Sequence, residues 1–554
     1  MRKGVLVAVA LAAVVLLPAK AEAAAPAGLV IASVKANLAV LPGHPFYVQA
    51  NVLNRAAHAR KAKVTVSLGA QNLVTRTATF RPLRRTLVKL PVKLTTLGRN
   101  PLKVAVTLAR PRRLVVDVAE FRARTGTVLV PDFAGYGGQF NHHVYSALSR
   151  AAGVTDDNVV DMEQKMRALH PEFSRIFFTP QAFTDPDKMQ SFVRTVQFAQ
   201  STGTDINITW QGGTFQPQPF ANVLVDLVRN KGITHLKWVT LQNEPNRTRM
   251  TMDVYEKQYR DLDPLIQSIR GQVKYMGGDL VRGPDTGAPN QDVWFQYLAA
   301  HMSDILDAYS IHVFWDYWDT SKLVQCLTEV RAIVNALPAN ARKPIYVTEY
   351  GVRGQRTFNG APQVDPGVWD DGTAITQTNV SAFQQAWFDV QAADLGYLGT
   401  SKWDSYYGKY DNGNQAYYLI GAPQSGWPLY PMYNLLQLFT TTVKRGWQVV
   451  AMDSVPNTSR ILAAYQGKQK QLTVIGLDTV GAQLNVGTTT TSSYSIAGFP
   501  PSKAVNLLVW NANADGLVAP RQRVTADPNG VVSVTVAQQS VFVLTTVRLG
   551  TAVS

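Results

Sequence analysis

Between residues 28 and 124 the apolar residues come in short runs that alternate with polar residues. The clearest cases are KVTVSL at residues 63–68 and LKVAVTL at residues 102–108. Such alternation puts every second side chain on the same face of a strand. Turn-forming residues at positions 42–43 (PG) and 98–101 (GRNP) separate the runs. Several short strands without helical periodicity predict an immunoglobulin-like β-sandwich over residues 26–124.

The pattern changes between residues 125 and 444, where short β-type runs alternate with amphipathic segments of helical period. Eight strands that alternate with helices predict a (β/α)₈ barrel, the TIM barrel. A doubly wound open sheet is the alternative, but it explains less well why polar and aromatic residues follow nearly every strand. The predicted strands are residues 128–133, 174–179, 205–210, 237–242, 273–277, 308–314, 345–349 and 399–405.

Strand-type runs return after residue 445 and end in SVFVLTTV at residues 540–547. They predict a C-terminal β-sandwich over residues 445–554, packed on the barrel. A detachable carbohydrate-binding module is the alternative, but no Pro/Ser-rich linker precedes residue 445. The predicted fold class is therefore α/β, with a TIM barrel flanked by an N-terminal and a C-terminal β-sandwich.

Residues 1–25 have the composition of a secretory signal peptide. Arg2 and Lys3 precede an apolar run, and small residues follow at positions 19–25 (AKAEAAA). A retained N-terminal anchor is the alternative, but the run is short for a membrane span. No later stretch is long and apolar enough to cross a bilayer, so we expect a secreted, extracellular or cell-envelope protein. Cys326 is the single cysteine, so the chain has no intramolecular disulfide.

The net charge of +16 is concentrated in the predicted N-terminal β-sandwich. Residues 24–124 hold 18 Lys and Arg against Asp117 and Glu120, whereas residues 125–554 are close to neutral. This surface is either a solvated basic face or a binding face for an anionic polysaccharide or cell-wall polymer. Nucleic acid is a poorer fit, because the basic strands lack interleaved aromatic residues and the chain is predicted to be exported.

Two glutamates follow predicted strands of the barrel. Glu244 lies in KWVTLQNEPN at residues 237–246, and Glu349 lies in PIYVTEYG at residues 344–351. The carboxyl ends of parallel barrel strands share one face, so we expect the two carboxylates to converge. Glycoside hydrolysis needs such a pair, with one proton donor and one nucleophile or base. A single Glu after a strand is more often a solvated loop residue, but the pair in this pattern favours a glycosidase site.

The NEP motif at residues 243–245, followed by Glu349 in TEYG, resembles the retaining glycoside hydrolases of clan A. Within this (β/α)₈ superfamily the chain is similar to families 39, 5 and 30. The resemblance covers residues 125–444 and, more loosely, the C-terminal region. It implies that Glu244 is the general acid/base and Glu349 the nucleophile. It also implies that Arg175 keeps the nucleophile ionised and that Asn243 binds the 2-hydroxyl of the sugar.

The same resemblance points to His312 on the sixth predicted strand, although a single His in a strand is more often a satisfied core residue. Several relatives carry a tyrosine two residues later that contacts the nucleophile, where this chain has Phe314. Another tyrosine would have to replace it, and the candidates are Tyr309, Tyr317 and Tyr350. A proton donor must hold its proton, so we expect a dry or negatively charged environment around Glu244.

Aromatic residues gather after the predicted strands, which suits a carbohydrate cleft because sugar rings pack their C–H faces on flat aromatic rings. Trp403 matches a clan tryptophan that forms the floor of the site. Trp210 and Trp315 are further predicted substrate-binding residues. Packing between barrel and helices is the alternative for about half of such aromatic positions.

These patterns together predict a secreted retaining β-glycoside hydrolase that acts on β-linked oligo- or polysaccharides. Nothing in the sequence resembles a Cys/His metal cluster or a phosphate-binding loop, so we expect neither a metal nor an organic cofactor. The alternative is a noncatalytic cell-envelope carbohydrate-binding protein whose barrel survives as a scaffold. The presence of both glutamates together with Asn243 and Arg175 favours the enzyme.

Overall fold

The computed structural model describes residues 28–248, 250–281, 291–410, 416–455, 459–480, 490–512 and 516–549. The chain divides into two compact units, Met1–Val118 and Ala119–Ser554. The predicted signal peptide, residues 1–25, lies outside the described residues. Among the residues that are described, no helix is long and apolar enough to cross a membrane.

The first unit is the predicted β-sandwich, whose two sheets enclose one apolar core. Alternation along its strands buries residues such as Val64 and Val66 and leaves Lys61 and Lys63 on the solvent side. One sheet has the order β1-β3-β6, made of Leu29–Lys35, Phe46–Asn54 and Arg85–Val92. The other has the order β2-β8-β7-β4-β5, made of Ala39–Val40, Arg112–Val118, Gly98–Val106, Arg60–Leu68 and Gln71–Phe80.

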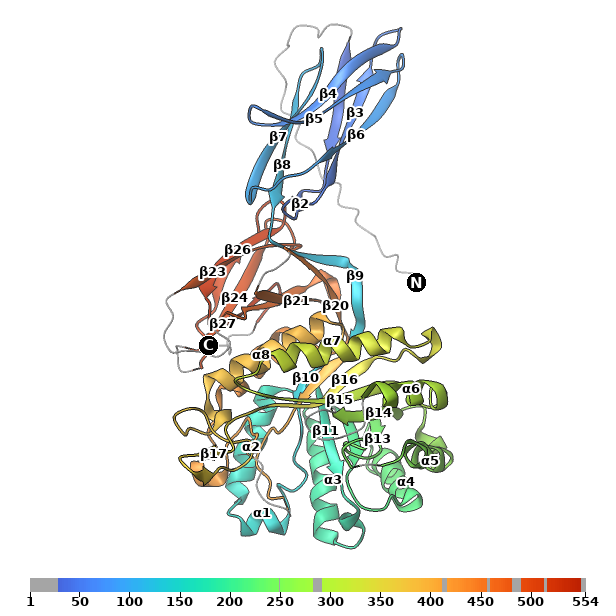
Figure 1. The fold of residues 1–554 in the computed structure, drawn as a ribbon, viewed down its shortest axis with the longest axis vertical. Coiled ribbons are helices and arrows are strands. Elements are labelled where there is room, and N and C mark those ends of the chain that lie inside the picture. The colour runs from blue at the N-terminus through green and yellow to red at the C-terminus, as the bar shows by residue number, and fades with distance from the viewer. Residues whose placement is uncertain are drawn as a thin grey trace, which may run out of the picture. The chain divides into compact units, whose positions relative to one another are not determined.

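The second unit contains a closed, parallel eight-stranded barrel, which confirms the predicted TIM barrel (Figure 1). Its strands are buried on both faces, as β11 illustrates with six buried residues in FSRIFF. Going round the barrel the strands are β10 (Gly135–Gly138), β11 (Phe173–Phe178), β12 (Asp205–Trp210), β13 (Leu236–Thr240), β14 (Lys274–Val281), β15 (Ala308–Asp316), β16 (Ile345–Arg353) and β19 (Gly399–Lys402).

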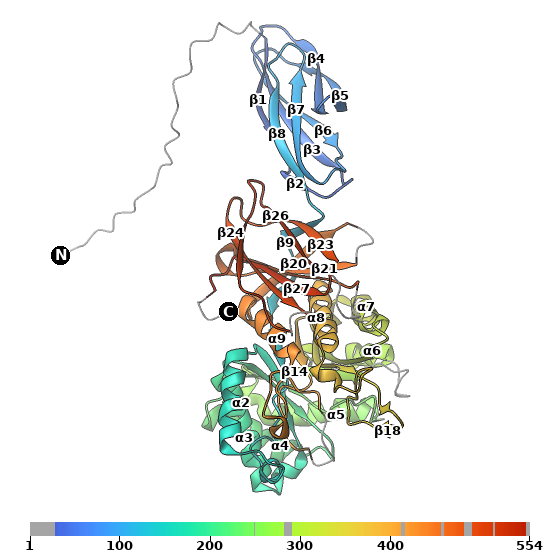
Figure 2. The same ribbon diagram turned by 90° about the vertical axis from the view of Figure 1, so that its left-hand side faces the viewer.

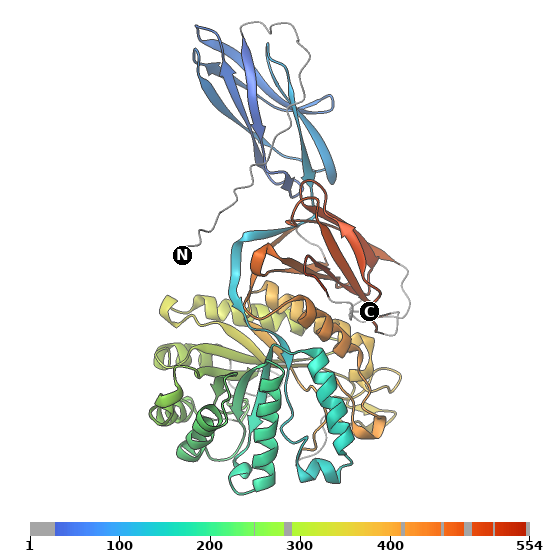
Figure 3. The same cartoon turned by 180° about the vertical axis from the view of Figure 1, so that it is seen from behind.

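The first barrel strand differs from the prediction. Residues 128–133 belong to β9 (Phe121–Phe133), which pairs with β20 (Trp447–Ser454) outside the barrel, as Figure 3 shows. The barrel instead begins with the glycine-rich β10. A Cβ on Gly137 or Gly138 would collide with the carbonyl oxygen of Phe173 or the hydroxyl of Ser405. This strand therefore needs glycine for close packing and carries no apolar alternation.

Helices cover the outside of the barrel, and Figure 2 shows α2, α3 and α4 against its strands. Local capping defines their starts: the Thr155 side chain forms a capping box with Asn158 at α2, and Asp185 caps α3 ahead of Pro186. The helices are α1 (Ala147–Ala151), α2 (Asp156–Leu169), α3 (Pro186–Ser201), α4 (Pro217–Val225), α5 (Met252–Leu262), α6 (Gln291–His301), α7 (Ser321–Ala336), α8 (Asn379–Asp394) and α9 (Pro431–Thr442).

The C-terminal β-region is one nine-stranded sheet among the described residues, in the order β25-β24-β27-β22-β21-β20-β9-β23-β26. Residues from distant strands of this sheet share one core, so the sheet curls into a sandwich-like body. Its other strands are β21 (Arg460–Gln466), β22 (Leu472–Asp478), β23 (Thr491–Ala497), β24 (Ala504–Asn511), β25 (Gln522–Thr525), β26 (Val531–Ala537) and β27 (Ser540–Thr545).

Because β9 precedes the barrel in sequence, the chain enters this sheet before the barrel and completes it afterwards. Residues 121–124, which the predicted boundaries assign to the N-terminal β-sandwich, lie in β9. Helices α8 and α9 pack between the barrel and the sheet in one continuous apolar core. A short hairpin, β17 (Thr357–Phe358) and β18 (Ala361–Pro362), follows β16 beyond the carboxyl end of the barrel.

Candidate active site

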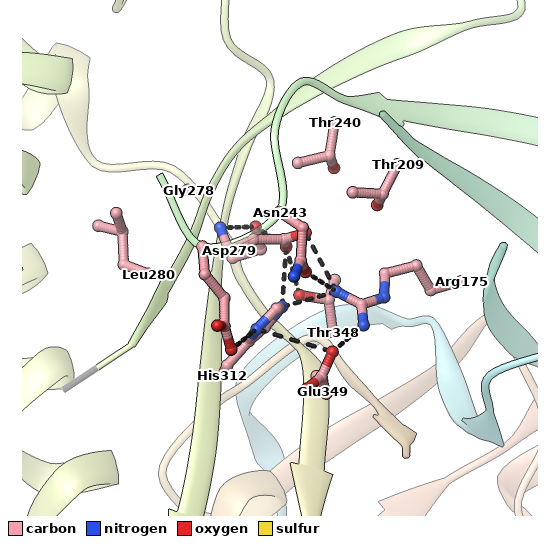
Figure 4. A network of polar contacts seen from close by, with 12 residues as sticks. Arg175, Thr209, Thr240, Asn243, Gly278, Asp279, Leu280, His312, Thr348 and Glu349 are labelled. Atoms are coloured by element: carbon pink, nitrogen blue, oxygen red, sulfur yellow. Dashed lines mark hydrogen bonds and ion pairs between the residues drawn. The ribbon is translucent and has the colours of Figure 1, made fainter. Parts of the chain in front are cut away.

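Polar side chains from five barrel strands or the loops after them meet at the carboxyl end of the barrel (Figure 4). Four of the predicted site residues meet here with side chains that are charged or titratable, and all four are buried. The meeting residues are Arg175 from β11, Asn243 and Glu244 after β13, Asp279 from β14, His312 from β15 and Glu349 from β16.

Arg175 holds Glu349. Its side chain is fully buried, and its Nη2 forms an ion pair with Glu349 Oε2. The rest of the guanidinium is fixed by Gln139 Oε1 at 2.8 Å from Nε, and by Asn243 Oδ1 at 3.1 Å and Asp279 Oδ2 at 3.2 Å from Nη1. A buried cation with this many acceptors cannot turn away, so Glu349 faces a permanent positive charge. Gln139, in the loop after β10, was not among the predicted residues.

Glu244 is buried, and its backbone is left-handed with φ of +50°. Its Oε1 lies 3.2 Å from His312 Nδ1, and its Oε2 accepts a hydrogen bond from Arg247 Nη1 at 2.8 Å. One carboxylate oxygen of Glu244, one of Glu349 and one ring nitrogen of His312 all lie within 4.8 Å of one another. The two carboxylates are therefore close neighbours. The predicted convergence of Glu244 and Glu349 is therefore present in the structure.

The charge state of Glu244 differs from what a proton donor needs. Burial alone would raise its pKa, but the hydrogen bonds and charges of His312 and Arg247 outweigh burial and lower the pKa to about 2. The expected dry environment is present, whereas the expected negative neighbours are offset by two cationic groups. The carboxyl group of Glu244 is thus ionised in the free site at neutral pH.

Asp279 is a fully buried carboxylate that sequence reasoning missed. Its Oδ1 accepts from the hydroxyls of Ser310 at 2.7 Å and Thr348 at 2.5 Å, and its Oδ2 pairs with Arg175. The residue has φ of +52° and lies at a register shift in β14, next to Gly278, where a Cβ would collide with the Ser310 carbonyl oxygen. A Gly-Gly-Asp sequence directly after a predicted strand was the available signal.

His312 is buried among these charges. Its Nε2 lies 2.8 Å from Arg175 Nη1 and 3.5 Å from Asp279 Oδ1, and its Nδ1 lies 3.8 Å from Glu349 Oε2. A guanidinium only donates, so the short Arg175 contact favours a neutral ring. Burial also disfavours the charged ring, but Glu349 and Asp279 outweigh both and raise the pKa of His312 to about 9. Three carboxylates surround the ring and only one guanidinium does, so the net charge around His312 favours its protonated form.

Trp403 lies beside the network and Trp210 and Trp315 do not. Trp403 packs in a cluster with Phe177, Phe314, Tyr410 and Tyr417, and the Arg175 guanidinium lies 5.8 Å from its ring centre. Trp210 packs on phenylalanines of α4 and the neighbouring loops, behind the barrel wall. Trp315 stacks on Phe388 of α8 and donates its indole N–H to Gln384. The structure thus places these two tryptophans in the barrel–helix core.

The three tyrosines considered as substitutes for a tyrosine at position 314 are engaged elsewhere. The Tyr309 hydroxyl donates to the Ala341 carbonyl oxygen at 2.8 Å, and the Tyr350 hydroxyl donates to Asp389 Oδ2 at 2.8 Å. The Tyr317 hydroxyl contacts Asp370. Phe314 itself packs edge-on against Tyr417. Among the described contacts, the basic partners of Glu349 are Arg175 and, at 3.8 Å, His312, and no tyrosine hydroxyl accompanies them.

The triad of Glu244, His312 and Glu349 is also spaced like a set of metal ligands. The positive charges around these three residues oppose the binding of a metal ion. Arg175 forms an ion pair with Glu349 and Arg247 forms one with Glu244, so a cation would have to displace two guanidiniums. The arrangement fits a carboxylate pair with its own counter-charges better than a metal centre.

Comparison with solved structures relates the fold of this chain to that of known enzymes. A GH30 endoxylanase from Clostridium papyrosolvens C71 aligns with a TM-score of 0.53 and 12% identity, over 77% of this chain and 99% of that one. An α-L-arabinofuranosidase from Thermotoga maritima aligns with a TM-score of 0.54 and 13% identity, over 78% and 100%. An endo-β1,6-glucanase aligns with a TM-score of 0.53 and 10% identity, over 88% and 100%.

The chain has the fold of these glycoside hydrolases. This confirms the fold that the clan A resemblance implies. No protein-family model matches the chain, and no curated protein sequence does either. At such low identity the comparison concerns the fold, and the chemistry has to be argued from the site itself.

Proposed function

We propose that this protein is a secreted retaining β-glycoside hydrolase that cleaves β-linked oligo- or polysaccharides. The observation that supports this most directly is the carboxylate pair: oxygen atoms of Glu244 and Glu349 lie within 4.8 Å of each other. Retaining enzymes hold their two carboxyl groups about 5–5.5 Å apart, whereas inverting enzymes leave about 6.5–9.5 Å for a water molecule. A separation of at most 4.8 Å between two of their oxygens lies on the short side of these ranges, which supports retention.

In the proposed first step Glu349 Oε attacks the anomeric carbon while the carboxyl group of Glu244 protonates the leaving oxygen. The bond from the anomeric carbon to the leaving oxygen breaks, and a covalent glycosyl ester forms on Glu349. In the second step Glu244 accepts a proton from water, which attacks the same carbon and releases Glu349. The Arg175 ion pair keeps Glu349 anionic before attack, and neither a metal nor an organic cofactor takes part.

The test is hydrolysis of aryl β-glycosides and of β-glucan, xylan and mannan by the purified chain, with the product followed by NMR from the first minutes. We expect the β-anomer to appear first and to equilibrate later. An initial α-anomer would refute retention. Binding of these polymers without any turnover would support the alternative, a noncatalytic carbohydrate-binding protein.

The proposed location outside the cytoplasm follows from the signal-peptide pattern of residues 1–25, ahead of a chain with a single cysteine. Mass spectrometry of the protein recovered from the culture medium or cell envelope tests this directly. We expect a mature N-terminus between residues 22 and 26. An intact Met1 on the recovered protein would contradict cleavage.

We further propose that the first unit binds an anionic polysaccharide or cell-wall polymer. Lys61 and Lys63 of β4, Lys103 of β7 and Arg113 of β8 are all exposed. Pairing of Lys103 with Arg113 across β7 and β8 sets basic side chains side by side on one sheet face. Binding should weaken steeply with salt, because exposed charges are screened beyond about 8 Å at physiological ionic strength.

Residues 119–554 are the right truncation for testing this proposal, because a start at residue 125 would cut β9. We expect the full chain to bind acidic polysaccharide at low salt and the truncated chain to bind it weakly. Equal binding by both, or binding that ignores salt, would refute the proposal. If the truncated chain does not fold, the first unit is a structural brace.

A further inference from the structure

The proton donor of the proposed mechanism has both of its oxygens occupied. Glu244 Oε1 faces His312 Nδ1 at 3.2 Å, and Glu244 Oε2 holds Arg247 Nη1 at 2.8 Å. A carboxyl group can protonate a leaving oxygen only if one of its own oxygens turns toward that atom. Each carboxyl oxygen has two lone pairs, so the two partners compete with the proton and the leaving oxygen for Glu244 without filling every site.

Arg247 is the partner that can move. His312 is fully buried and is held by Arg175 and Asp279 as well. The Arg247 side chain is 57% exposed and lies on the loop after β13, three residues beyond Glu244. Only the Arg247 end of this ion pair faces solvent, so a competing anion can reach the guanidinium without entering the buried network.

A second guanidinium lies nearby with hydrogen-bonding capacity to spare. Arg353, four residues after Glu349 on β16, lies 4.9 Å from the ring centre of Phe314 in the aromatic cluster beside the network. Its buried Nε has no hydrogen-bond partner among the described residues. Asp365 forms an ion pair with Arg356, its charge also acts on Arg247, and its Oδ1 accepts from Tyr417, which Arg353 contacts as well.

We propose that the leaving-group side of the site takes an anionic sugar, whose carboxylate or sulfate draws Arg247 away from Glu244. This inference rests on the proposed function. Arg247 exchanges one anion for another, so it remains paired throughout. Glu244 loses one of its two cationic partners and keeps His312. It then takes up a proton from solvent more readily and donates that proton to the leaving oxygen. The arrangement favours acidic substrates because a neutral leaving sugar leaves the Arg247–Glu244 pair intact.

The alternative is that Arg247 has a purely structural role and stabilises the loop after β13 through its ion pair with Glu244. The two explanations differ in selectivity. A brace lost in Arg247→Gln should reduce the cleavage of every substrate alike. Under the proposal, the same change should reduce the cleavage of anionic substrates more than that of neutral ones, because only an anionic leaving group binds Arg247.

The experiment uses three β-glycosides of the sugar found in the panel above, with 4-carboxyphenyl, 4-sulfophenyl and 4-carbamoylphenyl leaving groups. The readout is the ratio of kcat/KM for each anionic probe to that for the neutral carbamoyl probe. Comparing this ratio between variants cancels the difference in leaving-group reactivity. We expect Arg247→Gln to lower the ratio about tenfold, which corresponds to about 1.4 kcal/mol. Arg247→Lys, which keeps the charge, should fall between wild type and Arg247→Gln.

Arg260→Gln is the matched control, because Arg260 is a half-exposed arginine with carboxylate partners on the outer helix α5. It should leave the ratio unchanged. A lower ratio for the carboxylate probe alone identifies a uronic acid, and a lower ratio for both anionic probes identifies a general anion site. An unchanged ratio in Arg247→Gln overturns this inference alone. A wild type that cleaves none of the probes or panel substrates overturns the proposed function as well.

Discussion

Replacing Asp279 with asparagine removes one negative charge from the centre of the network and keeps the shape of the side chain. Asp279 pairs with Arg175 Nη1 at 3.2 Å and lies 3.5 Å from His312 Nε2, and all three side chains are buried. Breaking a buried ion pair costs about 3–5 kcal/mol of stability. Arg175 keeps Glu349 as a second partner, so we expect a loss of about 3 kcal/mol for Asp279→Asn at pH 6.

The pH dependence of this loss is the sharper test. The pKa of His312 is raised from 6.5 to about 9, chiefly by Glu349 and then by Asp279. A raised histidine pKa stabilises the folded state fully below pH 6.5, and the stabilisation is lost as pH rises through 9. The whole shift corresponds to about 3 kcal/mol, and Asp279 is one of the two carboxylates that raise the pKa. The deficit of Asp279→Asn should therefore shrink between pH 6 and pH 9.5, by less than about 3 kcal/mol.

Urea denaturation of wild type and variant at several pH values measures this directly. Other buried groups titrate in the same range, namely Lys402, Asp389 and Asp404, each with a pKa of about 7. They are common to both proteins, so the difference between the two curves isolates the network. Ser310→Ala is the control, because it removes a hydroxyl from Asp279 and keeps the charge. A deficit that stays constant from pH 6 to pH 9.5 would refute the coupling of Asp279 to His312.

Three further predictions concern the site. Glu349→Ala should abolish turnover and recover it with azide as an α-glycosyl azide, because a small anion fills the vacated position; recovery as a β-azide would remove Glu349 as nucleophile. Glu244→Ala should retain activity on aryl glycosides with good leaving groups and lose it on those with poor ones; equal loss on all of them would contradict the acid role. Arg175→Met should cost about 3–5 kcal/mol in urea denaturation, since it leaves Asp279 and Glu349 buried together without their cation, and a loss under about 1 kcal/mol would contradict that reasoning.

The sequence pattern predicts the positions of the barrel strands correctly where those strands are apolar, as at β11, β12 and β16. FSRIFF and the strand that carries Glu349 are buried on both faces, and this burial is what produces a continuous β-type run. The first strand escaped prediction because its glycines are selected by close packing, which leaves no apolar periodicity. The run at residues 128–133 looked like a barrel strand, yet Val128 and Leu129 are exposed and the strand pairs with β20.

The sequence by itself determined the fold class, the order of its parts and the two glutamates, because periodicity and short motifs are local properties of the chain. Which side chains share the site was decided only by the tertiary structure. Asp279 becomes a partner of Arg175 through a register shift in β14, and Arg247 becomes a partner of Glu244 through a loop with left-handed backbone. Trp210 in β12 and Trp315 in β15 turn to the helices, whereas Trp403 directly follows β19 and lies beside the network. Adjacent residues of a strand point to opposite faces, so one shift in register decides between the site and the core.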